Sequence, residues 1–274
     1  MNRHLPGQVE CRDHPATVPT MQVKDLPGCC TLPAPLAPLG EDLASLEVFC
    51  CRFDATQVDF ERDTSRLGVQ PPDNLWRAVA KRQAEYLAGR LCAREALRRL
   101  TGSAQVPGHR SQDRGPAWPA GQVGAITHSH GWAAAAVGRQ QEYLGIGLDA
   151  ESLLEPAKAL RLVDQILTPA ELARLHPLDE SEQAFAITLA FSAKESLFKA
   201  LHPQVQRMFF FQDAEILAWD RASGRFAIRL LSDLSPRWSA GAELSGHFQL
   251  DDEQRLLTLL AVRAQDHGYV SLAI

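Results

Sequence analysis

No hydrophobic run in this sequence approaches the ~18–20 residues that a helix needs to cross a bilayer. The stretch MNRHLPGQVECRDHPATVPT (residues 1–20) has no apolar segment of the kind found in secretory signals, so we expect no signal peptide. The chain also lacks an excess of positive charge, since 28 Lys and Arg stand against 33 Asp and Glu. A net charge of −5 gives no electrostatic basis for binding nucleic acid or an anionic membrane. An acidic ligand would have to be held by a local group of basic side chains.

Cysteine is absent after residue 92. Its distribution, with two adjacent pairs and all members in about the first third, does not resemble the disulfide framework of a secreted protein. A reducing, cytoplasmic setting is the expectation. The six cysteines are Cys11, Cys29, Cys30, Cys50, Cys51 and Cys92.

Three regions follow one another along the chain. Residues 1–40 carry seven prolines and no sustained periodicity, which predicts an extended and poorly ordered N-terminal extension. Residues 41–142 and 143–274 each contain one long helical pattern and several short strand patterns. We therefore predict an α+β protein built from two similar halves in one chain, related by a pseudo-twofold axis. Each half is expected to pack a small, mostly antiparallel sheet on a long helix.

The periodicity predicts particular elements. A strand is expected at 46–54, a long helix from Asp73, capped by that residue, to Thr101, two strands around a turn at 128–131, and a strand at 144–151. Thr168 and Glu171 are spaced as a capping box for a further helix. A second long helix is expected over about 180–201, ending before Pro203, and the rest of the chain reads mostly as strand.

Charged residues interrupt an apolar helix pattern in the stretch AFSAKESLFKA (190–200). At 100° per residue, Glu195 and Lys199 lie at the border of the apolar face, one turn apart, and could be an ordinary surface pair. Lys194 points into the middle of that face. A lysine there must either extend its amine to water or meet an anion.

A second group of acids lies in GIGLDAE (145–151). Asp149 and Glu151 would point the same way if both are in a strand, because side chains two apart share a face. Two like charges so placed repel one another unless a cation joins them. Mg²⁺ prefers oxygen ligands, so Glu195 as a third carboxylate would make a metal–phosphate site plausible. The alternative is that Glu151 only caps the next segment.

Basic and imidazole groups near these acids supply candidate phosphate partners. In THSHGW (127–132), His128 and His130 could be a metal-binding pair, a structural turn, or in the case of His128 a phosphate donor. Arg114, in the loop RGPAWP, and Lys81 and Arg82, on the first long helix, are further candidates, although each reads by default as solvated surface charge.

The order of these motifs resembles that of the 4′-phosphopantetheinyl transferase superfamily, and is closest to the type associated with enterobactin synthase. The resemblance runs from about residue 45 to the C-terminus. It is carried by RGPAWP, ITHSHG, GIGLDAE and LAFSAKESLFKA, with EYLAGRLCAREAL and LTPAELARL as supporting stretches. It implies transfer of the phosphopantetheine arm of coenzyme A to a serine of a carrier protein, with release of 3′,5′-ADP.

The resemblance also implies roles for the acids and lysines. Asp149 and Glu151 match the family's metal-binding acids. Glu195 matches a third acid that completes the metal site or removes the serine proton. Lys199, and with a looser match Lys194, fall where the family has lysines at the pyrophosphate. The implied cofactor is Mg²⁺, with Mn²⁺ as a possible substitute.

The nucleotide-binding residues implied by the resemblance come from earlier segments. Thr127 and His128 fall where the family has Ser-His at the nucleotide phosphates, and Arg114, Gly115 and Pro116 fall in the loop around the adenosine. Lys81 and Arg82 are the looser candidates for the 3′-phosphate.

The expected partners are coenzyme A and acidic acyl or peptidyl carrier proteins of siderophore, secondary-metabolite or fatty-acid synthesis. No nucleic acid partner is expected, and two similar halves in one chain favour a monomer. Two other classes fit some of the same residues. One is a metal-dependent phosphohydrolase acting on a nucleotide diphosphate, and the other is a carrier-binding module without catalytic activity.

Overall fold

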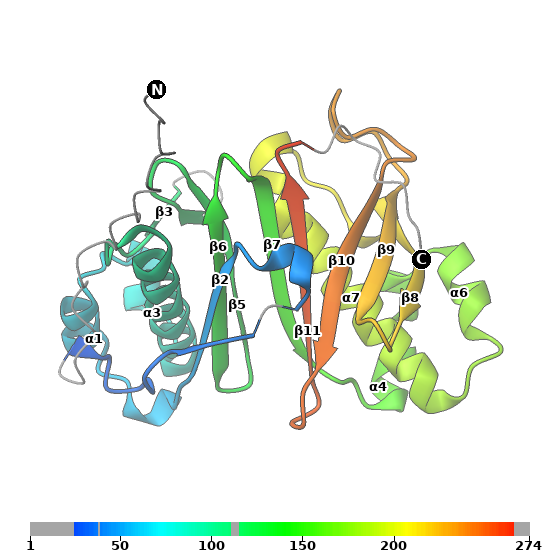
Figure 1. Ribbon diagram of the computed structural model, residues 1–274. Helices are drawn as coiled ribbons and strands as arrows, with labels where there is room; N and C mark the ends of the chain where they lie inside the picture. Colours follow the sequence, from blue (N-terminus) through cyan, green and yellow to red (C-terminus); the bar gives the residue numbers. More distant parts are fainter. Residues whose placement is uncertain (1–24, 38, 111–114, 266–274) are drawn as a thin grey trace, which may run out of the picture.

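The computed structural model describes residues 25–37, 39–110 and 115–265. These residues form two main sheets, each with one long helix on one face, and a small two-stranded sheet (Figure 1). The predicted α+β class is confirmed, with antiparallel pairing between neighbouring strands of both sheets. Among the described residues, no helix is both long and apolar enough to span a membrane.

The N-terminal sheet has the strand order β1-β2-β6-β5. Its members are β1 (Ala34–Pro35), β2 (Glu47–Arg52), β6 (Trp132–Arg139) and β5 (Gln122–Ser129), and α3 (Ala80–Thr101) packs on it. Ala133 and Ala135 leave room for this helix, whose buried face includes Leu87, Leu91 and Leu97. Smaller elements are η2 (Glu41–Leu43), η3 (Ala55–Gln57), α1 (Phe60–Leu67), α2 (Asp73–Trp76), β3 (Gly108–His109) and β4 (Pro116–Ala117).

The C-terminal sheet has the strand order β7-β11-β10-β9-β8. Its members are β7 (Tyr143–Ser152), β8 (Ala214–Asp220), β9 (Arg225–Leu230), β10 (Glu243–Leu250) and β11 (Arg255–Arg263), and α7 (Glu180–Val205) packs on β7 and β11. The other elements are α4 (Pro156–Leu160), α5 (Val163–Ile166), α6 (Pro169–Leu175) and η4 (Phe211–Asp213). The predicted capping box at Thr168 is present, with Glu171 bonded back to the Thr168 amide.

The two halves meet where β5, an edge strand of one sheet, runs beside β7, an edge strand of the other. An apolar cluster joins them, with Val48 and Ala136 on one side and Ile146, Leu148 and Leu259 on the other. Because β5 and β7 lie side by side on this shared core, the residues at their ends are next to one another. The pseudo-twofold relation and the division into three regions remain predictions.

Three local predictions are wrong. Residues 77–79 break the first long helix, so that Asp73 begins the short helix α2 and Val79 is the N-cap residue of α3. Pro203 lies inside α7, which continues to Val205 because a proline in the last turn sacrifices few helical bonds. The part of the predicted extension that the structure describes is not loose: Leu26 and Cys29 are buried, and Ala34 pairs with Cys50. Residues 1–24 lie outside the described part.

Candidate functional site

Two glycines of β7 allow α7 to approach the sheet closely. A Cβ atom added at Gly145 would lie 2.1 Å from the carbonyl oxygen of Ala200, and one at Gly147 would lie 1.7 Å from that of Ser196. Because the backbone of α7 occupies this space, any side chain at these positions would displace the helix. The GIG pattern therefore brings the charged residues of α7 against the acids that follow in β7.

Asp149 lies at the centre of this contact. Its Oδ1 atom accepts a hydrogen bond from Lys199 Nζ at 2.7 Å, and its Oδ2 atom accepts one from Ser192 Oγ at 2.8 Å. Lys199 also donates to the carbonyl oxygen of Leu148 at 3.0 Å. Asp149 is 5% exposed, and protein groups donate hydrogen bonds to both of its carboxylate oxygens.

The pKa values of Glu151 and Glu195 are both raised, and Asp149 contributes to both shifts. Burial raises the pKa of Glu151 to about 7, with Asp149 and Glu195 adding to the rise and Lys199 opposing it. Burial also raises the pKa of Glu195, where Lys199 again opposes and Asp149 adds. Three carboxylates from β7 and α7 therefore lie close enough to disfavour one another's charge. Such an excess of negative charge favours a bound cation.

The donor chemistry of these residues fits a hard divalent ion, which takes carboxylate oxygens and water. In the residues that the structure describes, however, no group of three His, Cys, Asp or Glu side chains is close enough to form a closed ligand set. The metal site expected from the sequence is therefore not seen as a finished coordination sphere in the described residues, and it stays a prediction.

The end of β5 adds a hydroxyl and an imidazole to the group. Thr127 Oγ1 accepts the amide hydrogen of Ala150 at 3.0 Å and lies 3.5 Å from Asp149 Oδ1. His128 Nε2 lies 2.8 Å from an Arg82 nitrogen of α3. Burial lowers the pKa of His128; Glu85 and Asp149 oppose this shift, and Arg82 and Lys199 add to it. Arg82, Thr127 and His128 thus lie near Asp149 and Lys199, and their binding roles stay predictions.

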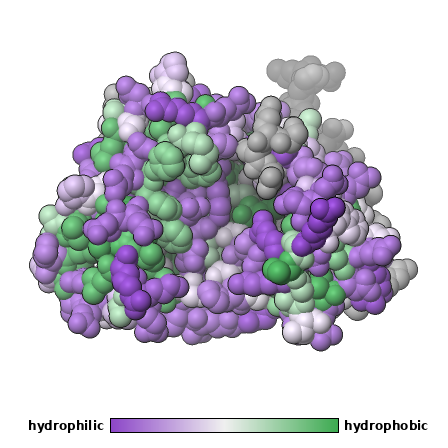
Figure 2. All heavy atoms as spheres, turned by 180° about the vertical axis from the view of Figure 1, so that it is seen from behind, coloured by the Kyte–Doolittle hydropathy of each residue, from purple (hydrophilic) through white to green (hydrophobic). Residues whose placement is uncertain are grey.

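A cleft of about 1000 Å³ opens beside Lys199 between the two halves. It is lined by β5 and β7 residues, by the end of α7, and by the β3–β4 hairpin through Arg110, Gly115 and Pro116. Its volume is at the upper end of the range usual for small-molecule sites. Seen from behind in Figure 2, the surface is hollowed between the halves, and hydrophobic side chains gather on the half to the left of the hollow.

A smaller pocket of about 210 Å³ adjoins Glu195 on the other side. Phe198 and Met208 line both this pocket and the large cleft, so the two are neighbours. Its walls are mainly apolar and include Phe209, Phe210 and Phe211. These phenylalanines belong to QVQRMFFFQ (204–212), a stretch that the sequence offers as a candidate docking strip for a carrier protein, and that role stays a prediction.

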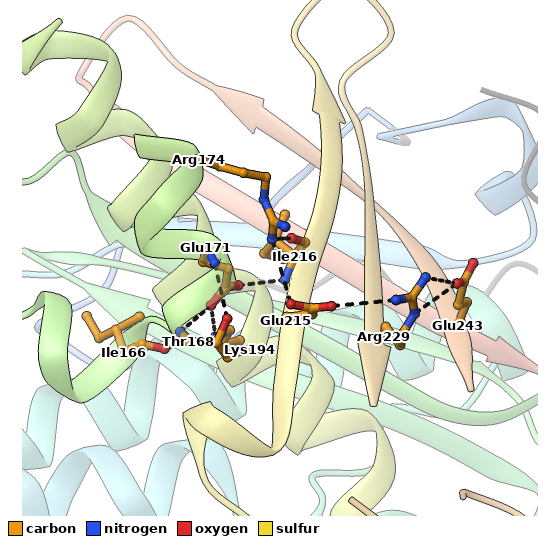
Figure 3. Close-up of polar contacts among 9 residues, drawn as sticks. All are labelled: Ile166, Thr168, Glu171, Arg174, Lys194, Glu215, Ile216, Arg229 and Glu243. Atoms are coloured by element: carbon orange, nitrogen blue, oxygen red, sulfur yellow. Dashed lines mark hydrogen bonds and ion pairs between the residues drawn. The ribbon is translucent and has the colours of Figure 1, made fainter. Parts of the chain in front are cut away.

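Lys194 is not among the site cations, which corrects the sequence expectation. Its side chain is buried, and Nζ donates to Glu171 Oε2 at 2.7 Å and to the carbonyl oxygen of Ile166 at 2.8 Å (Figure 3). Glu171 also accepts the Ile216 amide hydrogen at 2.6 Å. The anion that meets this lysine is therefore a protein carboxylate that ties α6 and β8 to α7.

Two further candidates that the structure describes, Lys81 and His130, do not join the group. Lys81 is exposed at the start of α3, and no contact brings it to the acids. Arg114 lies outside the described residues. His130 does not join His128: its Nδ1 atom lies 3.0 Å from the hydroxyls of both Ser129 and Ser152, in a residue with a positive φ of 43° at the β5–β6 turn.

Comparison with known proteins identifies the class. Residues 71–138 match the family model of the 4′-phosphopantetheinyl transferase N-terminal domain, and residues 145–258 match that of the 4′-phosphopantetheinyl transferase superfamily. The chain belongs to this superfamily and is an enzyme of the 4′-phosphopantetheinyl transferase class.

Individual relatives agree with this membership. The chain is 42% identical over 147 residues to enterobactin synthase component D of Escherichia coli O157:H7, covering 54% of this chain and 67% of the relative. It is 36% identical over 178 residues to 4′-phosphopantetheinyl transferase PptT of Mycobacterium tuberculosis, covering 62% and 71%. It is 37% identical over 183 residues to 4′-phosphopantetheinyl transferase Svp of Streptomyces mobaraensis, covering 61% and 72%.

Among solved structures, the holo-ACP-synthase of Plasmodium yoelii matches with a TM-score of 0.31 and 16% identity. The match covers 45% of this chain and 97% of that one.

Proposed function

We propose that this enzyme transfers the 4′-phosphopantetheine arm of coenzyme A to a serine of an apo acyl or peptidyl carrier protein and releases 3′,5′-ADP. One observation carries the proposal: Asp149, Glu151, Glu195 and Lys199 meet beside a cleft large enough for a nucleotide. The names of the relatives, among them enterobactin synthase component D, support carrier-protein modification as the reaction.

The cleft suits a strongly anionic ligand although the whole chain is mildly acidic. Arg110 and Lys199 line it, and Arg82 and His128 stand beside Asp149 and Lys199. These groups supply the local positive charge and the hydrogen-bond donors that phosphate oxygens require. We assign the β3–β4 hairpin, with Gly115 and Pro116, to the nucleoside end and Lys199 to the pyrophosphate.

Asp149, Glu151 and Glu195 would hold Mg²⁺, or Mn²⁺ in its place. When bound, the ion would neutralise charge on the pyrophosphate and so favour departure of 3′,5′-ADP. The raised pKa values of Glu151 and Glu195 support this assignment, because a cation would relieve the repulsion that contributes to them.

The chemistry of the protein groups follows. A serine hydroxyl is a weak nucleophile at its own pKa and needs a base within hydrogen-bond reach. Glu195 takes the serine proton as the serine oxygen bonds to the phosphorus that carries the pantetheine arm. The bond from that phosphorus to the bridging oxygen breaks, and Lys199 stabilises the charge that develops on the leaving phosphate.

Intact-mass analysis of a panel of apo carrier proteins, incubated with coenzyme A, Mg²⁺ and the enzyme, tests the proposal. We expect at least one carrier to gain the mass of one phosphopantetheinyl group and 3′,5′-ADP to appear with it. The same carrier with its acceptor serine replaced by alanine is the matched control and should gain nothing.

Two further results would contradict the proposal. Release of 3′,5′-ADP from coenzyme A without any carrier would favour the phosphohydrolase. Carrier binding without a mass gain across the panel would favour a binding module. The monomeric state and the cytoplasmic location remain predictions.

A further inference from the structure

Two serines of the stretch AFSAKESLFKA (190–200) lie one turn apart on α7. These residues, Ser192 and Ser196, have no exposed surface. Both contact Thr258 of β11, which is equally buried. The Ser192 and Thr258 hydroxyl oxygens are 2.9 Å apart, and those of Ser196 and Thr258 are 2.8 Å apart. The three hydroxyls form one connected cluster between the helix and the sheet, and one end of it reaches Asp149.

The hydrogen bond to Asp149 sets the direction of the neighbouring bond in this cluster. Ser192 Oγ donates its single hydrogen to Asp149 Oδ2 at 2.8 Å. Ser192 must then accept from Thr258, because its own hydrogen is used. Ser196 Oγ faces two oxygens of Thr258, the hydroxyl at 2.8 Å and the backbone carbonyl at 3.1 Å, and its single hydrogen is shared between them. Donation toward the carboxylate therefore runs from Thr258 through Ser192 to Asp149, with Ser196 behind Thr258, and each bond polarises the next.

The hydroxyl cluster lies where α7 packs closely on the sheet. Thr258 stands directly opposite Asp149 in the antiparallel register of β7 and β11. Gly147 allows α7 to approach until the helix backbone touches the strand. The hydroxyls are therefore attached to the sheet that carries the acids and to the helix that carries Glu195 and Lys199. Their geometry links the two elements that make the site.

We propose that Ser192 is a positioning residue, with Thr258 and Ser196 behind it. It holds Oδ2 of Asp149 so that the carboxylate faces Lys199 and the divalent ion assigned to the site. The inference rests on the proposed function, since it concerns how that site holds its metal. A positioned ligand loses less freedom on metal binding, and outer groups of this kind typically change metal affinity by about 10–100-fold.

A purely structural role makes a different prediction. If the three hydroxyls only form hydrogen bonds with one another where α7 packs on the sheet, removing Ser192 or Ser196 should have the same effect on metal binding. Each loses one buried oxygen from the same helix face. If Ser192 positions Asp149, its removal should weaken metal binding more, because Ser196 acts on the carboxylate only through two other hydroxyls.

Mn²⁺ binding followed by electron paramagnetic resonance separates the two roles without using activity. We expect Ser192→Ala to weaken Mn²⁺ binding about 10–100-fold, and Ser196→Ala to weaken it clearly less at a similar melting temperature. The carrier assay should show a matching shift in the Mg²⁺ concentration for half-maximal rate. Equal Mn²⁺ affinities in the two variants would overturn the inference.

A second pair of variants covers the case in which Ser192→Ala does not fold. Thr258→Val keeps the shape but removes the hydrogen donated to Ser192, whereas Thr258→Ser keeps that hydroxyl. Weakened Mn²⁺ binding in the valine variant, restored in the serine variant, supports the inference, and equal binding in both overturns it. A wild-type enzyme that transfers normally but binds no Mn²⁺ would overturn the inference while leaving the transfer reaction standing. A wild type that neither transfers nor binds Mn²⁺ would overturn both.

Discussion

Lys199 on α7 binds Asp149 on β7 through an Nζ–Oδ1 contact of 2.7 Å. The pair joins the two segments that carry the candidate acids, and the lysine also lines the large cleft. An ammonium in this position can contact both a site carboxylate and an incoming phosphate. Its dual contact makes Lys199 the most informative cation to change.

Lys199→Ala should lower kcat for transfer by about 10²–10³-fold, the usual loss when one group that stabilises developing charge is removed. Lys199→Arg keeps the charge and should retain more activity, although its planar fork cannot reproduce both lysine bonds. Steady-state kinetics with coenzyme A as the varied substrate measures both effects. An alanine variant with unchanged kcat would remove Lys199 from the mechanism.

Lys194→Met should destabilise the fold rather than weaken coenzyme A binding. It leaves the buried Glu171 carboxylate without its cation, and breaking one side of a buried pair costs about 3–5 kcal/mol. Glu171→Gln is the matched partner, and the double variant should lose less stability than the sum of the two single changes. Urea unfolding measures the free energy of unfolding of each single variant and of the double variant. Unchanged stability combined with weaker coenzyme A binding would instead support the role that the sequence suggested.

Glu151→Gln should flatten the pH dependence of stability between about pH 4.3 and 7. The folded protein raises the pKa of Glu151 to about 7, whereas an unfolded glutamate has a pKa of about 4.3. The native state therefore holds this proton more tightly, and the associated stability is complete below the unfolded pKa and is lost as pH rises through the folded one. Melting temperatures of both proteins across this range test the sign.

The exposed change Glu61→Gln on α1 is the control for the pH experiment and should leave the slope as in the wild type. Saturating Mn²⁺ should also reduce the slope in the wild type, because a cation favours the charged carboxylate. Identical slopes in the wild type and Glu151→Gln would mean that Glu151 does not hold its proton in the folded protein.

Gly147→Ala should unfold or distort the C-terminal half. The added Cβ would lie 1.7 Å from the carbonyl oxygen of Ser196, and the helix backbone cannot give way as a side-chain tip could. Overpacking of this kind usually costs about 1–3 kcal/mol and sometimes more. Gly108→Ala, whose Cβ would come no closer than 4.0 Å to Ala117, is the matched control. Circular dichroism and melting temperature report the difference, and a normal melting temperature for Gly147→Ala would contradict the packing.

Short-range patterns predicted several proximities in the candidate site, and contacts between distant segments could not be predicted. Alternation in the strand put Asp149 and Glu151 together, and the helical period put Glu195 beside Lys199. The same period placed Lys194 on the buried face, but its anion, Glu171, is distant in sequence and could not be recognised from spacing. The hydroxyl of Thr258 was likewise invisible, because only the β7–β11 register brings it opposite Asp149.

The helix boundaries show the same limit. Pro203 suggested a stop, yet the helix continues to Val205, since a proline in the final turn removes little hydrogen bonding. The proline-rich segment before residue 40 suggested disorder, yet Leu26 and Cys29 find apolar partners in the N-terminal core. In both cases the deciding contact lies with a distant part of the fold.

The account depends above all on Glu195 acting as the base of a site that includes Asp149, Glu151 and Lys199. Glu195→Gln keeps the shape of the side chain and removes its ability to take a proton. We predict that it folds, retains coenzyme A affinity, and modifies the apo carrier about 10²–10⁴-fold more slowly than the wild type. If intact-mass kinetics show the glutamine variant loading the carrier at close to the wild-type rate, Glu195 is not the base.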